Sequence, residues 1–237
     1  MCIIYLTVHY SAVMKLLHYG LQRSGTNFLE TAIKKNYRVK FLNDNQDRSS
    51  PLHKHFRLYD EKEIIPEPQY RNDLKITSFK EFERLLEVVP DYYLVISKDP
   101  YSWLLSYTRW AEQCHWPDVS HPYLIEYNLF YGKWLEFSGQ TDRILFVRYL
   151  DLLQDSDKEL SRLESQIALK KKFLSPFTSR LITKVPQSEE FSNNRREYYL
   201  TRQYLKSYTR EELHTINTLI DPQVLSGLDY QNIENIQ

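Results

Sequence analysis

The sequence predicts an α/β protein whose central parallel sheet carries helices on both faces, a three-layer arrangement. Short apolar runs of strand length alternate along the chain with segments whose apolar residues recur at helical spacing. This alternation indicates a parallel sheet covered on both faces. A glycine-containing turn, residues 20–27, joins the first apolar run to the first helical segment. Because ligands bind beyond the carboxyl ends of the strands in such sheets, this turn is the first candidate site.

Four segments are expected to form the strands. The first begins at Leu16, and the others span 37–42, 92–97 and 143–148. Residues 92–97 are almost continuously apolar, as expected for a parallel strand that is buried on both faces. Residues 37–42 alternate polar and apolar side chains, a pattern that also favours a strand.

The helices are predicted mainly from their first residues. Ser78 and Glu81 form a capping box at the start of one helix. Asp99 and Pro100 suit the N-cap and first residue of another, over 101–113. Further helices are expected from the turn to about 36, at 123–137, from 155 or 156 to about 168, at 195–206, and at 210–220 behind a capping box of Thr209 and Glu212. Residues 60–76 and 170–194 are expected to be irregular.

A chain of 237 residues suits a single α/β domain with a substantial core. We expect that domain to span 14–237. Met14 lies immediately before the first strand, so residues 1–13 are expected to be an N-terminal extension outside the core.

Composition excludes several classes of function. The chain has 31 basic and 31 acidic residues, and this neutral balance argues against binding nucleic acid through a broad electrostatic surface. No apolar run approaches the roughly 20 residues that span a bilayer. Cys2 and Cys114 lie far apart and give neither a metal-ligand spacing nor a disulfide framework. We therefore expect a cytoplasmic protein in a reducing compartment, without a bound metal or a transmembrane segment.

The turn partly fits the pattern of a phosphate-binding loop, or P-loop. Gly20 and Gly25 bracket four residues, as in G-x-x-x-x-G-K-[ST], but Thr26 stands where the lysine belongs. That lysine reaches the β- and γ-phosphates of a nucleoside triphosphate. Here the cation is Arg23, before the second glycine. The amides of 25–27 would begin a helix and point at an anion, so the turn predicts a P-loop-type nucleotide site without a triphosphate–metal clamp.

Three segments together resemble the sulfotransferases that use 3′-phosphoadenosine 5′-phosphosulfate (PAPS). Residues 23–26, Arg-Ser-Gly-Thr, match the family's 5′-phosphosulfate loop, and arginine at the first position is found in members that act on carbohydrates. Residues 98–100, Lys-Asp-Pro, with Ser106 eight positions beyond Lys98, are similar to the family's 3′-phosphate element. Residues 148–152, Arg-Tyr-Leu-Asp-Leu, resemble its strand end near the adenine.

The resemblance implies PAPS as donor and adenosine 3′,5′-bisphosphate (PAP) as product, with no metal. Five residues of the turn would hold the 5′ end: Arg23, Ser24, Gly25, Thr26 and Asn27. Lys98 and Ser106 would bind the 3′-phosphate, and Tyr149 would lie near the adenine. Arg195 and Arg196 are further candidates for the 3′-phosphate.

A general base must take the proton of the acceptor. Histidine has the most suitable pKa, and the segment His53-Lys54-His55 is similar to a Lys-x-His element of the family. We favour His55 over His53 as the base, with Lys54 as a second cation and Arg23 offsetting charge on the bridging oxygen. A glutamate, Glu61 or Glu63, is the alternative base.

The predicted reaction moves a sulfuryl group to an acceptor hydroxyl, of a carbohydrate or small alcohol, or to an amine. The acceptor is expected to be a small molecule or a glycan, recognised by residues 43–76 and 112–125. Two alternatives remain open at this point: a P-loop nucleotide kinase-like phosphotransferase, and a non-catalytic nucleotide-binding module.

Overall fold

The protein is described here by a computed structural model, which places residues 13–58, 76–116, 118–119, 121–172 and 193–234. Within these ranges, four strands form one sheet: β1 (Met14–Tyr19), β2 (Val39–Phe41), β3 (Tyr92–Ser97) and β4 (Ile144–Arg148). Their order across the sheet is β2-β1-β3-β4, and every neighbouring pair is parallel. The four predicted strands are therefore confirmed.

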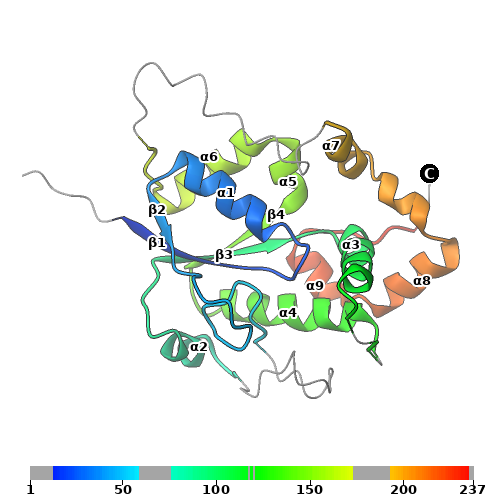
Figure 1. Ribbon diagram of the computed structural model, residues 1–237, viewed down its shortest axis with the longest axis horizontal. Coiled ribbons are helices and arrows are strands. Elements are labelled where there is room, and N and C mark those ends of the chain that lie inside the picture. The colour runs from blue at the N-terminus through cyan, green and yellow to red at the C-terminus, as the bar shows by residue number, and fades with distance from the viewer. Residues whose placement is uncertain (1–12, 59–75, 117, 120, 173–192, 235–237) are drawn as a thin grey trace, which may run out of the picture.

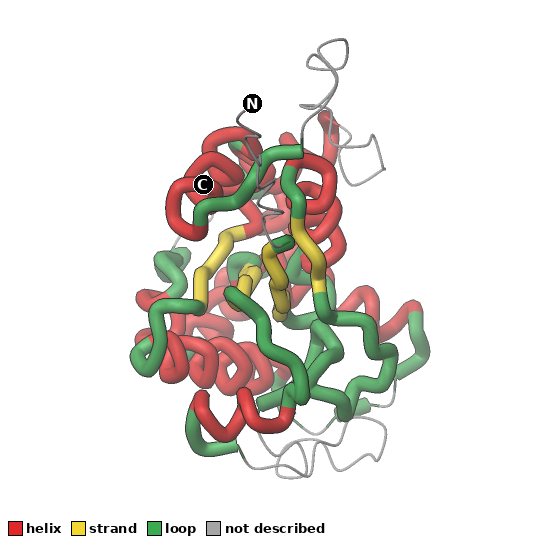
Figure 2. The backbone as a smooth tube through the Cα atoms, turned by 90° about the vertical axis from the view of Figure 1, so that its left-hand side faces the viewer, coloured by secondary structure: helices red, strands yellow, loops and turns green. Residues whose placement is uncertain are grey.

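Helices cover both faces of this sheet. The described chain contains α1 (Thr26–Asn36), α2 (Phe79–Leu85), α3 (Pro100–Gln113), α4 (Tyr123–Ser138), α5 (Tyr149–Gln154), α6 (Ser156–Ile167), α7 (Asn193–Leu200), the 3₁₀-helix η4 (Gln203–Ser207), α8 (Arg210–Leu219) and α9 (Pro222–Gly227). Helices α1, α5 and α6 lie on one side of the strands and α4 and α9 on the other (Figure 1). Figure 2 shows the strands side by side between these layers. The predicted α/β class is confirmed.

Three helices begin with the N-caps that the sequence predicts, although at Ser78 the Glu81 carboxylate accepts from the amide and hydroxyl of Thr77, so only the Ser78 half of that capping box forms. The Ser78 hydroxyl accepts a hydrogen bond from the amide of Glu81 at the start of α2. The Asp99 carboxylate accepts one from the amide of Ser102 at the start of α3. Thr209 begins α8 with a complete capping box. These caps satisfy backbone donors that a helix cannot satisfy itself.

Several boundaries differ from the prediction. The helix expected at 195–206 is two pieces, because Arg202 has a φ of 54° and ends the run between α7 and η4. The short helices α5 and α9 were not predicted. Strand β1 begins at Met14, two residues before the expected Leu16. The expected N-terminal extension lies, except for Val13, outside the described residues, and most of the irregular stretches 60–76 and 170–194 lies outside them too.

Aromatic side chains fill the space between the sheet and α4. The Tyr19 ring stacks on Trp134 with 4.7 Å between ring centroids, and Phe82 meets the same indole edge-on at 5.6 Å. All three side chains are fully buried, as is Tyr93. His18 is buried as well, and its Nδ1 lies 2.9 Å from the Asn43 side-chain oxygen. Burial of such large rings supplies much of the hydrophobic stabilisation.

The strand order determines where a ligand can bind. From β1 the chain passes to β2 on one side, and then crosses to β3 on the other side of β1. In an open parallel sheet, this reversal leaves a crevice beyond the carboxyl ends of the two central strands. The turn after Tyr19, the residues after Ser97 and the start of α5 after Arg148 all lie at this edge.

We predict that Phe82→Ala lowers the free energy of unfolding by about 3–5 kcal/mol, because it leaves a cavity among packed rings. Urea denaturation followed by tryptophan fluorescence measures the change. Val89 is 77% exposed, so Val89→Ala is the matched control and should change stability by less than about 0.5 kcal/mol. Equal effects of the two substitutions would contradict this core.

Candidate functional site

The turn between β1 and α1 requires glycine at both of its ends. Gly25 has a φ of 101°, in the left-handed region, and a Cβ there would lie 2.5 Å from the Tyr149 ring. A Cβ on Gly20 would lie 2.4 Å from the Ser24 hydroxyl and 2.8 Å from the Ile96 carbonyl oxygen. The turn is therefore pressed against β3 and against the first residue of α5.

Helix α1 begins directly at this turn with its amino end toward the crevice. Within the described chain, no side chain caps it at Gly25. The first amides of a helix have no acceptor within the helix, and the helix dipole adds partial positive charge there. Gly25, Thr26 and Asn27 line the cavity at this end, so the start of α1 is suited to bind an anion.

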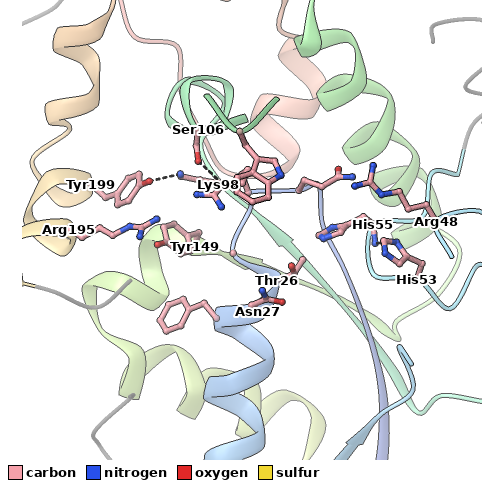
Figure 3. Close-up of a pocket in the computed structure, with 15 residues that line it drawn as sticks. Thr26, Asn27, Arg48, His53, His55, Lys98, Ser106, Tyr149, Arg195 and Tyr199 are labelled. Atoms are coloured by element: carbon pink, nitrogen blue, oxygen red, sulfur yellow. Dashed lines mark hydrogen bonds between the residues drawn. The ribbon is translucent and has the colours of Figure 1, made fainter. Parts of the chain in front are cut away.

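One cavity brings together most of the residues that the sequence singled out. Its lining includes Arg23, Gly25, Thr26, Asn27, His53, His55, Lys98, Ser106 and Tyr149. Figure 3 shows Lys98 and Tyr199 at one end of the cavity, with Arg48, His53 and His55 at the other. Thr26 and Asn27 lie between the two groups. The cavity is thus elongated, with cations at both ends.

Two of the predicted residues take other places. The Ser24 side chain is fully buried and does not line the cavity. Lys54 does not line it either, but its ammonium donates a hydrogen bond to the Asn27 side-chain oxygen, and its carbonyl accepts from the amide of Gly20 at 3.1 Å. Lys54 therefore holds the histidine segment against the turn.

Arg23 connects the turn to α3. Its Nε donates to the Ser106 hydroxyl at 3.2 Å, and its guanidinium lies 4.9 Å from the centre of the Trp110 ring. Arg23 has a φ of 69°, which is uncommon for a residue other than glycine. The turn thus directs the Arg23 side chain across the cavity to Ser106, the residue eight positions beyond Lys98.

Lys98 is almost fully buried at the end of β3. Its Nζ donates to the Tyr199 hydroxyl at 2.9 Å and lies 4.2 Å from the centre of that ring. Burial lowers the pKa of Lys98, and the neighbouring Tyr199 partly offsets this. Burial opposes ionisation of Tyr199, but Lys98 and Arg195 outweigh it and lower the pKa of the phenol. An anion bound beside Lys98 and Arg195 would therefore be stabilised by their positive charges.

The two histidines differ in which ring nitrogen can accept a proton. His55 Nδ1 lies 2.7 Å from the Gly20 carbonyl oxygen, which can only accept, so Nδ1 carries the hydrogen. In the neutral ring, Nε2 then has the lone pair. His53 Nδ1 accepts from the amide of His55 at 3.1 Å, so its own hydrogen is on Nε2. Of the two, His55 has a lone pair on the outer nitrogen and is the better placed base.

Burial keeps both rings neutral. It lowers the pKa of His55 well below its usual value, and the positive charges of Lys54 and Arg57 act in the same direction. Burial, with the charges of Arg48 and Lys54, lowers the pKa of His53 to about 4. Both imidazoles are therefore unprotonated at neutral pH, as a general base must be.

A buried ion pair anchors the histidine segment from behind. Arg57 Nη2 lies 2.8 Å from a carboxylate oxygen of Glu126 on α4, and both side chains are almost fully buried. The same nitrogen donates to the side-chain oxygen of Gln22 and to the Tyr107 hydroxyl, each at 3.2 Å. His121 approaches the other oxygen of Glu126 at 3.3 Å. This network joins the segment to the turn, α3 and α4.

Some lining residues were missed by the sequence analysis. Gln22, Phe28, Arg48 and Tyr199 belong to the cavity, and Phe28 meets the Tyr149 ring edge-on with 5.8 Å between centroids. Of the two arginines considered, Arg195 lines the cavity, whereas Arg196 donates to the Gln154 carbonyl oxygen. The alternative bases, Glu61 and Glu63, lie outside the described residues.

The charge of the cavity is one-sided. Among the described residues, no aspartate or glutamate lines it, although the whole chain has equal numbers of acidic and basic residues. Over the same residues, no three His, Cys, Asp or Glu side chains gather in a way that would hold a metal ion. The described helices include none that is long and apolar enough to cross a membrane. The arrangement is suited to an anionic ligand.

Comparisons with known proteins add no relatives. No model of a known protein family matches the chain, and no curated protein matches it. The geometry of the cavity and the motifs that line it are therefore the basis for assigning a function.

We predict that Glu126→Gln lowers the free energy of unfolding by about 3–5 kcal/mol, because it leaves the buried charge of Arg57 without its counter-ion. Chemical denaturation at neutral pH measures the effect. Glu136→Gln on the same helix is the control, since Glu136 pairs with Lys133 at the surface, where a pair contributes at most about 1 kcal/mol. A loss below that of the control would contradict the anchoring role.

Stability should also fall as the pH is lowered from about 6.5 to about 4. Burial lowers the pKa of His18 from 6.5 to about 4, against the opposing effect of Glu30. The unfolded chain therefore binds more protons in this range, and the stability contributed by neutral His18 is complete above pH 6.5 and lost toward pH 4. The slope for one such group approaches about 1.4 kcal/mol per pH unit.

Urea denaturation at several pH values measures this slope. His18→Leu should make it shallower, whereas His214→Gln, at an exposed position of α8, should leave it unchanged. A slope that is identical in the wild-type protein and His18→Leu would show that His18 does not titrate as described.

Proposed function

We propose that the protein is a PAPS-dependent sulfotransferase of the P-loop nucleotide-binding type. The observation that carries the proposal is convergence: three segments that resemble the family's motifs, around residues 23–27, 98–106 and 149, line a single cavity. Its lining is cationic and, over the described residues, has no acidic side chain. PAPS carries negative charge at the 3′-phosphate and at the 5′-phosphosulfate, and the cavity matches this distribution with Lys98 and Arg195 in one part and with Arg23 and the start of α1 in another.

Different residues of the chain would bind the different parts of the donor. The amides at the start of α1 and the guanidinium of Arg23 would hold the 5′ end, where fixed donors stabilise developing charge. Lys98, Ser106 and Arg195 would hold the 3′-phosphate. The rings of Phe28 and Tyr149 would contact the adenine, which has flat apolar faces.

The proposed reaction needs one base and good positioning. The acceptor oxygen forms a bond to sulfur, the bond from sulfur to the bridging oxygen breaks, and PAP leaves with that oxygen. His55 Nε2 takes the proton of the acceptor hydroxyl, since the Gly20 carbonyl holds its other nitrogen in the donor form. Arg23 offsets the charge left on the bridging oxygen. Alignment of donor and acceptor would supply most of the rate enhancement, as in phosphoryl transfer.

A P-loop kinase fits the cavity less well. The lysine that would bind a triphosphate is replaced by Thr26, and Asp99, the acidic residue nearest the end of β3, caps α3 through the amide of Ser102. A non-catalytic nucleotide-binding module would share the cavity and differ only in turnover. The cytoplasmic setting and a glycan or small-molecule acceptor, expected from composition and from the resemblance, belong to this proposal.

The donor site is tested by isothermal titration with PAP in the absence of magnesium. We expect binding, weakened about tenfold or more in Lys98→Met and in Ser106→Ala, because each removes a hydrogen bond to a charged phosphate. Lys206→Ala, at an exposed position of η4, is the control and should bind as the wild-type protein does. Binding of ATP with magnesium, without binding of PAP, would overturn the proposal in favour of a kinase.

The base is tested by one substitution at each of the two histidines. His55→Asn keeps a donor for the Gly20 carbonyl but removes the outer nitrogen, so transfer should fall about 10²–10⁴-fold while PAP affinity is retained. His53→Asn should reduce transfer far less. If His55→Asn transfers sulfuryl groups at the wild-type rate, another residue is the base. If the wild-type protein binds PAP but shows no transfer, the non-catalytic module is favoured.

A further inference from the structure

Tyr199 is a buried tyrosine of α7 that lies outside the three segments with a resemblance to family motifs. It lines the cavity beside the residues proposed to hold the 3′-phosphate, which are Lys98, Ser106 and Arg195. Figure 3 shows its phenol directed toward the Lys98 side chain. The phenol therefore lies in the part of the cavity where that phosphate would bind.

The hydrogen bond between Lys98 and Tyr199 has a defined direction. An ammonium group can only donate, so the phenol oxygen accepts from Lys98 Nζ, at 2.9 Å. The hydroxyl hydrogen of Tyr199 is therefore directed away from Nζ and can be donated to a ligand. Because successive hydrogen bonds polarise one another, a phenol that accepts from a cation is a stronger donor.

Two positive charges act on this phenol. Lys98 approaches it from the end of β3, and Arg195 lies on α7 itself. Burial of Tyr199 opposes ionisation, but the charges of Lys98 and Arg195 outweigh it and lower the pKa of the phenol. The direction of this pKa shift agrees with a hydroxyl that is polarised toward donation.

Neighbouring rings hold the phenol and the ammonium side by side. Tyr149 of α5 meets Tyr199 edge-on with 5.5 Å between ring centroids, and Tyr204 of η4 lies at 6.2 Å. Lys98 Nζ lies 4.2 Å from the centre of the Tyr199 ring and 5.5 Å from the centre of the Tyr149 ring. Packing thus fixes both groups at the end of β3.

We propose that Tyr199 is a specificity-determining residue of the donor site, whose hydroxyl donates a hydrogen bond to the 3′-phosphate beside Lys98. This proposal rests on the proposed function and adds a residue to its donor site. A lysine alone is a point charge and attracts any anion. Lys98 and Tyr199 together offer two donor atoms 2.9 Å apart, and two adjacent donors bind two oxygens of one phosphate, as a guanidinium does. The pair therefore recognises the position of the phosphate as well as its charge.

Calorimetry with three nucleotides tests this role on the full chain. The probes are PAP, its isomer adenosine 2′,5′-bisphosphate, and adenosine 5′-phosphate. The wild-type protein should bind PAP about tenfold or more tightly than either of the others. Tyr199→Phe keeps the ring and removes the hydroxyl, so PAP affinity should fall about tenfold or more. Its affinity for adenosine 5′-phosphate should stay unchanged, and its preference for PAP over the isomer should narrow.

Tyr198 provides the matched control, because it precedes Tyr199 on α7 but lines a neighbouring cavity instead of this one. Tyr198→Phe should bind all three nucleotides as the wild-type protein does. An equal loss of affinity for all three nucleotides in Tyr199→Phe would overturn the proposal, because the hydroxyl would then act only on packing. Unchanged PAP affinity in Tyr199→Phe would overturn it too, as would the same loss in Tyr198→Phe.

The double variant Lys98→Met with Tyr199→Phe tests whether the two residues act as a pair. Because Lys98 polarises the hydroxyl, each substitution should matter less once the other is made. The double variant should therefore bind PAP about threefold or more tightly than the product of the two single losses gives. Single losses that simply multiply would show that Lys98 and Tyr199 act separately, and would overturn the pair.

The two proposals fail differently. If the wild-type protein does not bind PAP, the donor assignment is wrong and the role of Tyr199 falls with it. If PAP binds and Lys98→Met weakens it, but Tyr199→Phe binds PAP as the wild-type protein does, the sulfotransferase proposal stands and only the role of Tyr199 is excluded.

Discussion

Parallel pairing of β1, β3 and β4 is the constraint on which the rest of the structure depends. Tyr19 of β1 lies opposite Val95, and Ser97 of β3 lies opposite Arg148, so three strands end at one edge of the sheet. At this edge β1 continues into the glycine turn, β3 continues into Lys98, and β4 continues into Tyr149. Segments far apart in the sequence therefore meet around one cavity without any long loop to bring them there. Contact between Gly25 and the Tyr149 ring then fixes the turn at the start of α1.

Charge is arranged around this edge in two layers. The buried pair of Arg57 and Glu126 lies behind the cavity and neutralises itself, so it holds the histidine segment without adding net charge. The cavity itself is lined by cations and by neutral imidazoles, with no acidic side chain among the described residues. In a chain of zero formal net charge, this separation concentrates positive potential where an anionic ligand would bind.

Local patterns predicted much of this arrangement, and tertiary contacts decided the remainder. The Gly-containing turn and the offset between Lys98 and Ser106 are short-range features, so the sequence showed them directly. Tyr199 is 101 positions from Lys98 in the sequence, and the two side chains meet only because α7 packs nearby. A local sequence pattern cannot predict such a contact. The break at Arg202 also had no signal, because arginine is not a residue that normally marks a left-handed turn.

A double-mutant cycle between protein and nucleotide tests the central claim most directly, namely that Lys98 and the turn bind opposite ends of one nucleotide. The affinities of PAP and of adenosine 5′-phosphate are measured for the wild-type protein and for Lys98→Met. If the claim is correct, removing the 3′-phosphate weakens binding to the wild-type protein about tenfold or more, and weakens binding to Lys98→Met much less. An equal loss in both proteins would contradict it, because Lys98 would then make no contact with that phosphate.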